Sequence, residues 1–342
     1  MEIPEPGYHI FGMGSRRKLL YRGGALLDIA TGEELRRWDV SSETIDTAEH
    51  RVVLETSGGT VTVLEDEESL RTEEPGGGEV LAGSPVRLPR FEGRYAGLLR
   101  ALHAEVLVNI IPAGPVPCLL VYDTPWYRDA AMMCMVLERT GNLHLVADWI
   151  MSLAEVFDRN NAGNREPDNL GELLYMISLV SDGSHPPVPG ILAAAREFER
   201  EGHIAGLTDG AEHPVYQTKW MKFGLRALGL DDPYEIPEVA DSYSALFWMD
   251  WRDRHVPTEP FGERSRELYP YLAWAEAHFH GWPPPMELAG AAPITWEARA
   301  SEADYGRMSA VSAGHVEARV SLPHTWHAAE MFLYLVESEQ GN

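Results

Sequence analysis

The spacing of apolar residues changes near residue 90, and this change constrains the fold more than any other feature. Between residues 8 and 88, short runs rich in β-branched and aromatic residues, such as Arg51–Leu54 and Thr60–Leu64, alternate with Gly-containing turns. Such runs are typical of β-strands, and the clearest pair predicts a hairpin through Ser57-Gly58-Gly59. We therefore expect residues 1–90 to form a small β-rich N-terminal domain.

After residue 91 the apolar residues recur at the spacing of an α-helix, beginning with Tyr95, Leu98, Leu99 and Leu102. The same pattern recurs at residues 129–140, 143–157, 169–181, 188–201, 215–228, 237–250, 264–279 and 324–338. About nine or ten helices, joined alternately by short turns and longer polar loops, predict a mainly α fold, an (α/α)6 toroid of helical hairpins over residues 91–342. The longer loops are expected to gather at one end of the toroid, where a binding site is usually built.

The charge of the chain excludes several classes of partner. Asp and Glu number 53 against 28 Lys and Arg, which gives a formal charge of -25. A surface this negative repels nucleic acid and anionic lipid, so neither is expected as a partner. The two cysteines, Cys118 and Cys134, are too few for a disulfide scaffold, and no run of about 18 apolar residues is present. We expect a soluble cytoplasmic protein, and its oligomeric state stays open.

The segment around Trp126 offers the first candidate site. A polar, aromatic loop ends in Arg128-Asp129 at the start of a predicted helix, where a capping carboxylate and a surface arginine would be an ordinary arrangement. This Trp-x-Arg-Asp-Ala sequence, followed by the turn Arg139–Gly141, resembles the substrate loop of the six-hairpin glycosidases, a superfamily that includes glucoamylases, trehalases and mannosylglycerate-hydrolase-like enzymes. The resemblance implies that Arg128 and Asp129, with Trp126 and Tyr127 beside them, bind the sugar in subsite −1.

A second polar loop precedes the next predicted helix. It contains Glu166, Asp168 and Asn169. In the toroids that the chain resembles, such a loop supplies the general acid, which implies this role for Asp168 and leaves Glu166 as a reserve or substrate-binding group. Helix capping by Asp168 or Asn169, with Glu172 in the first turn, explains the same residues without catalysis.

The C-terminal segment resembles the closing helix of glucoamylase-like toroids, in which a loop shortly upstream carries the catalytic base. The candidates for the base between residues 281 and 319 are Glu287, Glu297, Glu302 and Glu317. Glu287 is preferred because a Pro-rich loop can hold a carboxylate rigidly, and Glu297 beside Trp296 comes second. The residues expected near the pocket are Trp296, Glu297, His324 and Trp326.

Together these carboxylates predict an inverting glycoside hydrolase that acts on a small or short-chain glycoside. One carboxylic acid protonates the leaving oxygen and a carboxylate activates water, so the two groups should stand about 6.5–9.5 Å apart. Nine of the ten tryptophans fall between Trp126 and Trp326, and their flat faces are suited to sugar rings. The predicted partner is a carbohydrate substrate, with no cofactor and no metal.

Three alternatives stay open. A metal-dependent enzyme could use the C-terminal histidines, although residues three apart spread around a helix rather than converge. A non-catalytic carbohydrate-binding toroid would place Trp126, Arg128 and Asp129 around a pocket without two facing carboxylates. A phosphorylase on the same toroid would need basic or hydroxyl groups for phosphate in place of the base. The possible metal ligands are His278, His280, His324, His327 and Glu330.

Overall fold

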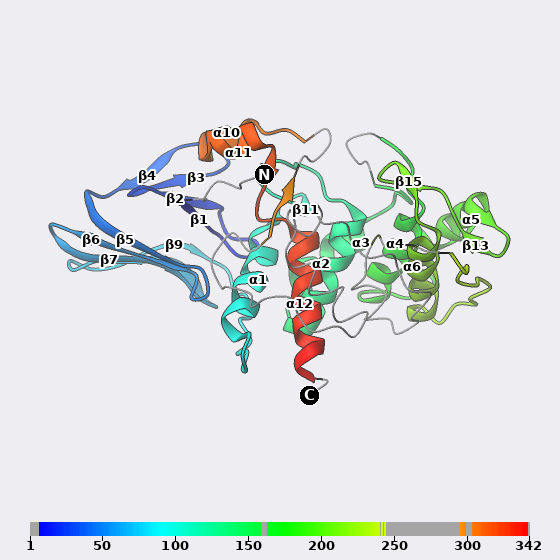
Figure 1. Ribbon diagram of the computed structural model, residues 1–342. Helices are drawn as coiled ribbons and strands as arrows, with labels where there is room; N and C mark the ends of the chain where they lie inside the picture. The colour runs from blue at the N-terminus through cyan, green and yellow to red at the C-terminus, as the bar shows by residue number, and fades with distance from the viewer. Residues whose placement is uncertain are drawn as a thin grey trace.

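The computed structural model describes residues 7–158, 163–239, 241, 243, 295–298 and 303–340 of the chain (Figure 1). Two antiparallel sheets come first along the chain. The inner sheet has the order β1 (Tyr8–Phe11), β2 (Leu19–Arg22), β3 (Ala25–Asp28) and β4 (Glu34–Arg37). The outer sheet has the order β5 (Val40–Asp46), β6 (Arg51–Thr56), β7 (Gly59–Glu65), β8 (Ser69–Glu73) and β9 (Glu79–Gly83). Thr56 pairs with Gly59, which confirms the predicted hairpin.

Strands β1 to β3 of the inner sheet are largely buried, which explains their mostly apolar sequence, whereas β4 is largely exposed. Phe11, Leu19 and Tyr21 pack against the outer sheet, whereas Tyr8 and Leu20 belong to the same apolar cluster as the helices. The strands of the outer sheet alternate between buried and more exposed residues, as expected for a sheet with one solvent-facing side. The resulting layers are outer sheet, inner sheet and helices (Figure 1).

Helices dominate the chain after β9. They are α1 (Ala96–Val108), α2 (Tyr127–Thr140), a 3-10 turn (Leu143–Leu145), α3 (Ala147–Ser152), α4 (Asp168–Ser178), α5 (Val188–Phe198), α6 (Pro214–Ala227), α10 (Gly306–Val311), α11 (Ala313–Ala318) and α12 (Thr325–Gln340). Four short antiparallel pairs accompany them: β10 (Ile110–Ile111) with β11 (Gly114–Pro115), β12 (Glu199–Arg200) with β13 (His203–Ile204), β14 (Leu207–Thr208) with β15 (Ala211–Glu212), and β16 (Glu297–Ala298) with β17 (Val320–Ser321).

The C-terminal helix α12 lies between α1 and α2, and α4 and α6 continue the row beyond α2 (Figure 1). The contact between α4 and α6 is close because a Cβ on Gly171 would lie 2.1 Å from the carbonyl carbon of Trp220. Thr325, the first residue of α12, donates its backbone N–H to the carbonyl of Pro117 at 2.9 Å. None of the helices in the described ranges combines the length and the apolar character that crossing a membrane requires.

The predicted mainly α toroid is wrong. Of the described residues, 36% are helical and 23% lie in strands, and the inner sheet forms one wall of the helical core. Helical periodicity shows that each helix buries one face, but it does not identify the neighbour that covers this face. The predicted helix at 264–279 lies outside the described residues, as do nine of the fourteen residues of 237–250. The division into domains at residue 90 stays a prediction.

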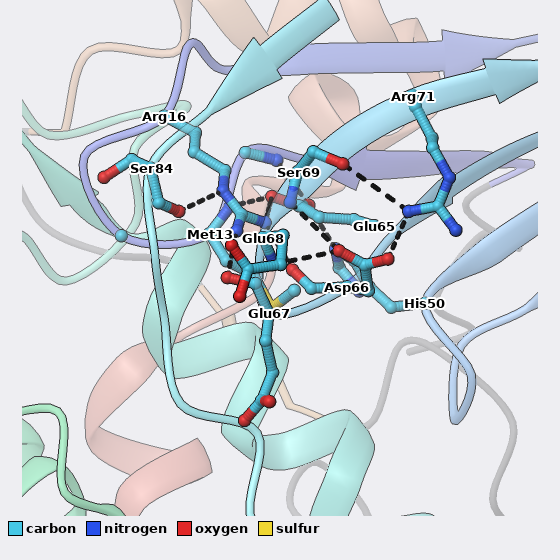
Figure 2. A network of polar contacts seen from close by, with 12 residues as sticks. Met13, Arg16, His50, Glu65, Asp66, Glu67, Glu68, Ser69, Arg71 and Ser84 are labelled. Carbon is cyan, nitrogen blue, oxygen red and sulfur yellow. Dashed lines mark hydrogen bonds and ion pairs between the residues drawn. The ribbon is translucent and has the colours of Figure 1, made fainter. Parts of the chain in front are cut away.

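A buried carboxylate joins the two sheets to the helices (Figure 2). Glu65 of β7 accepts hydrogen bonds from the backbone N–H groups of Gly12 and Met13 at 2.8 and 2.7 Å. Arg16 Nη1 and His50 Nε2 each lie 3.0 Å from its oxygens. Burial raises the pKa of Glu65, but these hydrogen bonds and the charge of His50 outweigh burial and lower it to about 2. Glu65 therefore holds the turn at Gly12 and Met13 in place against α1.

We expect Glu65→Gln to destabilise the protein by about 3 kcal/mol at pH 7, because Arg16 loses its charged partner in a buried site. A carboxylate with a lowered folded-state pKa stabilises the fold above its unfolded pKa of about 4.5, and this stabilisation disappears as the pH falls towards about 2. Urea denaturation between pH 7 and pH 3 measures both effects. The matched control is Glu55→Gln at an exposed position of β6, and an equal loss in both variants would contradict the assignment.

Candidate active site

Arg128 is buried and contacts three carboxylates, of which Glu166 and Asp168 are buried and Asp209 is half exposed. It stands in the first turn of α2, and its three guanidinium nitrogens donate to three different side chains. Nε donates to Asp168 at 2.9 Å, Nη1 donates to Asp209 at 3.0 Å, and Nη2 donates to Glu166. Because each nitrogen already holds a carboxylate, Arg128 is a structural cation as well as a neighbour of the candidate site.

Asp168 is fully enclosed at the start of α4. One of its oxygens accepts from Arg128, and the other accepts from the hydroxyl of Thr208 at 3.0 Å. Glu166 is held in the same way, because its second oxygen accepts the backbone N–H of Asp209 at 3.0 Å. Through these contacts, both carboxylates position Arg128 and the β14–β15 turn. The role of Asp168 as a proton donor stays a prediction from the resemblance.

Asp129, the next residue of α2, is buried beside the first turn of α12. Its Oδ1 accepts from the hydroxyl of Thr325 at 3.3 Å. Burial raises the pKa of Asp129 to about 6, although the charges of His324 and Arg128 act in the opposite direction. Asp129 therefore holds a proton well into the range where an ordinary aspartate has lost it.

Glu297 of β16 lies beside His324, the residue that precedes Thr325. Its Oε2 accepts from the hydroxyl of Tyr122 at 2.8 Å and lies 3.1 Å from His324 Nε2. Burial raises the pKa of Glu297, but the charge and hydrogen bond of His324, together with Tyr122, lower it overall. Burial lowers the pKa of His324, yet Glu297 raises it overall. The two groups form an ion pair, and the Glu297 side chain keeps 27% of its surface exposed.

Two carboxyl groups thus share one site with opposite pKa shifts. The charge of Glu297 raises the pKa of Asp129, which shows that the two groups interact electrostatically. The two groups come from α2 and β16, which are far apart in sequence. The segment leading from β17 into α12 contacts both, because Thr325 contacts Asp129 and His324 contacts Glu297. A pair of carboxyls that titrate apart at one site is the arrangement that acid–base catalysis requires.

Aromatic rings surround this pair. The ring centroids of Tyr122 and Trp126 lie 5.0 Å apart, and those of Tyr243 and Trp326 lie 6.1 Å apart. The guanidinium carbon of Arg128 lies 5.7 Å from the centroid of Tyr243. Trp126 is half-buried, so part of this residue remains exposed to solvent.

The positions of three other predicted site residues, Tyr127, Trp296 and Glu287, differ from one another. The ring of Tyr127 is buried, and its hydroxyl donates to the carbonyl of Glu155 at 2.9 Å, so it anchors the loop. Trp296 is half-buried beside Glu297. Glu287, the preferred base, lies outside the described residues.

Three residues of the site were missed from sequence. Tyr122 lies four residues before Trp126, but nothing in the sequence pairs it with Glu297. Asp209 lies in the turn between β14 and β15 with a φ of +50°, and Tyr243 donates its hydroxyl to it. No spacing along the chain connects either residue to Arg128, so only the folded structure could identify them.

The histidines of α12 do not form a metal centre with the described residues. Within the described ranges, no group of three or more His, Cys, Asp or Glu side chains is arranged to hold a metal ion. The rings of His324 and His327 lie 5.0 Å apart, and burial lowers the pKa of His327 well below its ordinary value. His278 and His280 lie outside the described residues. His324 instead forms an ion pair with Glu297.

No protein-family model, curated protein or solved structure compared with this chain matches it. The resemblance to the six-hairpin glycosidases rests on short motifs and stays a prediction. The geometry of Asp129, Glu297 and His324 is independent of that resemblance, because it follows from the packing of α12.

We expect Arg128→Met to destabilise the protein by about 3–5 kcal/mol at pH 7, since the buried carboxylates of Glu166 and Asp168 would lose their shared cation. The loss should shrink as the pH falls to about 4, where carboxylates become neutral. Urea denaturation at the two pH values measures this difference. Arg37→Met, which breaks an exposed pair with Glu34 on β4, serves as the control and should cost less than about 1 kcal/mol. Equal losses in the two variants would contradict the structural role of Arg128.

Proposed function

We propose that the protein hydrolyses the glycosidic bond of a small or short-chain glycoside, with Asp129 as the proton donor and Glu297 as the ionised carboxylate. The main support is that two adjacent residues, Thr325 and His324, contact Asp129 and Glu297 respectively, and that the pKa values of these two carboxyl groups shift in opposite directions. Glycoside hydrolysis needs one protonated and one ionised carboxyl group at the same pH. Burial favours the protonated form of Asp129, and the ion pair with His324 favours the ionised form of Glu297.

Each group then has a defined part in an inverting reaction. Asp129 gives its proton to the leaving oxygen while the bond from that oxygen to the anomeric carbon breaks. Water forms the new bond to the anomeric carbon and passes its proton to Glu297. Tyr122 and His324 are positioning residues, because they hold Glu297 in its ionised form.

The proposed acid and base differ from the residues that the sequence predicted first, Asp168 and Glu287. Asp168 has both oxygens occupied and no exposed surface, whereas Asp129 carries the raised pKa. Glu297, the second choice from sequence, contacts His324 directly. The half-buried residue Trp126 supports a carbohydrate substrate because flat apolar faces pack against sugar rings. A cytoplasmic location is also proposed, supported by two buried, unpaired cysteines.

The pH profile should be bell-shaped. Asp129 must be protonated, so kcat/KM should fall as the pH rises through about 6. Glu297 must be ionised, and its lowered pKa places the acidic limb below the ordinary range of a glutamate. In His324→Gln, Glu297 loses its cationic partner, and the acidic limb should move to higher pH. A profile that stays flat from pH 4 to pH 8 would contradict these roles.

Substitution of either carboxyl should reduce kcat by about 10²–10⁴-fold without unfolding the protein. The variants are Asp129→Asn and Glu297→Gln, and the control is Asp148→Asn on the exposed side of α3. A screen of aryl glycosides and natural disaccharides identifies the substrate, and NMR of the first product anomer tests inversion. Full activity in either variant would overturn the assignment. Sugar binding without turnover in the native protein would instead support a carbohydrate-binding protein.

A further inference from the structure

A groove lies at the far end of the helices that carry the candidate active site. Its volume is about 540 Å³, within the range of small-molecule sites. The lining includes Arg90, Phe91, Leu99, Arg139, Phe332 and Val336. Arg139 stands eleven residues after Arg128 on α2, which separates the groove from the active site by about 16 Å along the helix axis.

The groove differs in charge from the chain as a whole. The segment from residue 87 to residue 94 carries Arg87, Arg90 and Arg94 against one acidic residue, Glu92, whereas the full chain has a formal charge of -25. Arg90 is exposed, and its side chain makes no hydrogen bond or ion pair with the described part of the chain. Arg139 has an interaction of its own, so it adds to the local charge without supplying the main donor.

Apolar side chains form part of the remaining lining, and Phe91 and Val336 are among its partly exposed members. Phe91 and Phe332 meet edge to face, with their ring centroids 5.5 Å apart. Leu99 and Val336 complete this surface from α1 and α12. A ligand suited to these walls has a flat apolar body, because aromatic pairs and aliphatic side chains bury such a body without unpaired polar groups.

We propose that this groove binds a small molecule that carries one carboxylate or phosphate group on a flat apolar body. The planar guanidinium of Arg90 presents parallel N–H donors that match the two oxygens of either anion. Glu92 at the rim disfavours a second negative charge on the ligand. This site is separate from the proposed hydrolytic site and does not depend on that function.

Isothermal titration of the full chain with phenyl phosphate, benzoate and benzyl alcohol tests the proposal. The two anions should bind with a Kd of about 1 mM, which is typical of ligands with so few atoms, and the neutral alcohol should bind at least tenfold more weakly. Whichever anion binds more tightly then distinguishes a phosphate ligand from a carboxylate ligand. Failure of both anions to bind below 10 mM, or equal binding of the alcohol, would overturn the proposal.

Variants locate the binding. Arg90→Gln should weaken anion binding about tenfold, because a charge-assisted pair becomes a neutral contact. Arg87→Gln, three residues earlier on the same segment and outside the groove lining, is the matched control and should retain the native Kd. Val336→Trp fills the groove and should abolish binding with the charges unchanged. An unchanged Kd in Arg90→Gln would show that the anion binds elsewhere.

Discussion

The insertion of α12 between α1 and α2 is the constraint on which the remaining structure depends. Two donors hold its first residue: the backbone N–H of Thr325 donates to the carbonyl of Pro117, and its single hydroxyl lies 3.3 Å from both the carbonyl of Val116 and the carboxyl of Asp129. The apolar side of the helix is buried among the helices that precede it by about 200 residues. Without this insertion α1 and α2 would expose their apolar faces, and Glu297 and His324 would lose their position beside Asp129.

The candidate site also depends on which neighbouring groups stabilise each buried charge. Arg128 is surrounded by Glu166, Asp168 and Asp209, and each of these carboxylates contacts a different nitrogen of the guanidinium. A buried charge that lacks such partners is costly, so these groups stabilise one another. Among the described residues no cation lies in direct contact with Asp129, and burial raises its pKa. Glu297 has His324 in contact and stays ionised, so the acid and the base differ because their partners differ.

The local sequence predicted much of the fold. The hairpin at Ser57–Gly59 and the helices that became α2, α4 and α12 follow from strand and helix periodicity, which depends only on neighbouring residues. The helix predicted over 143–157 instead became a 3-10 turn and a short α3 that ends at Ser152. The toroid failed for a longer-range reason: the inner sheet, which was expected to belong to a separate domain, covers part of the helical core. Periodicity could not reveal that contact.

For the site, the sequence by itself determined the chemical groups and their local setting: an Arg-Asp pair in the first turn of a helix, a carboxylate in a short segment beside Trp296, and a histidine at the start of the last helix. The tertiary structure alone decided which of these groups became acid, base or structural counter-ion. The physical reason is that a protonation state depends on burial and on the nearest charge. Both are set by contacts between residues far apart along the chain, such as Tyr122, Glu297 and His324.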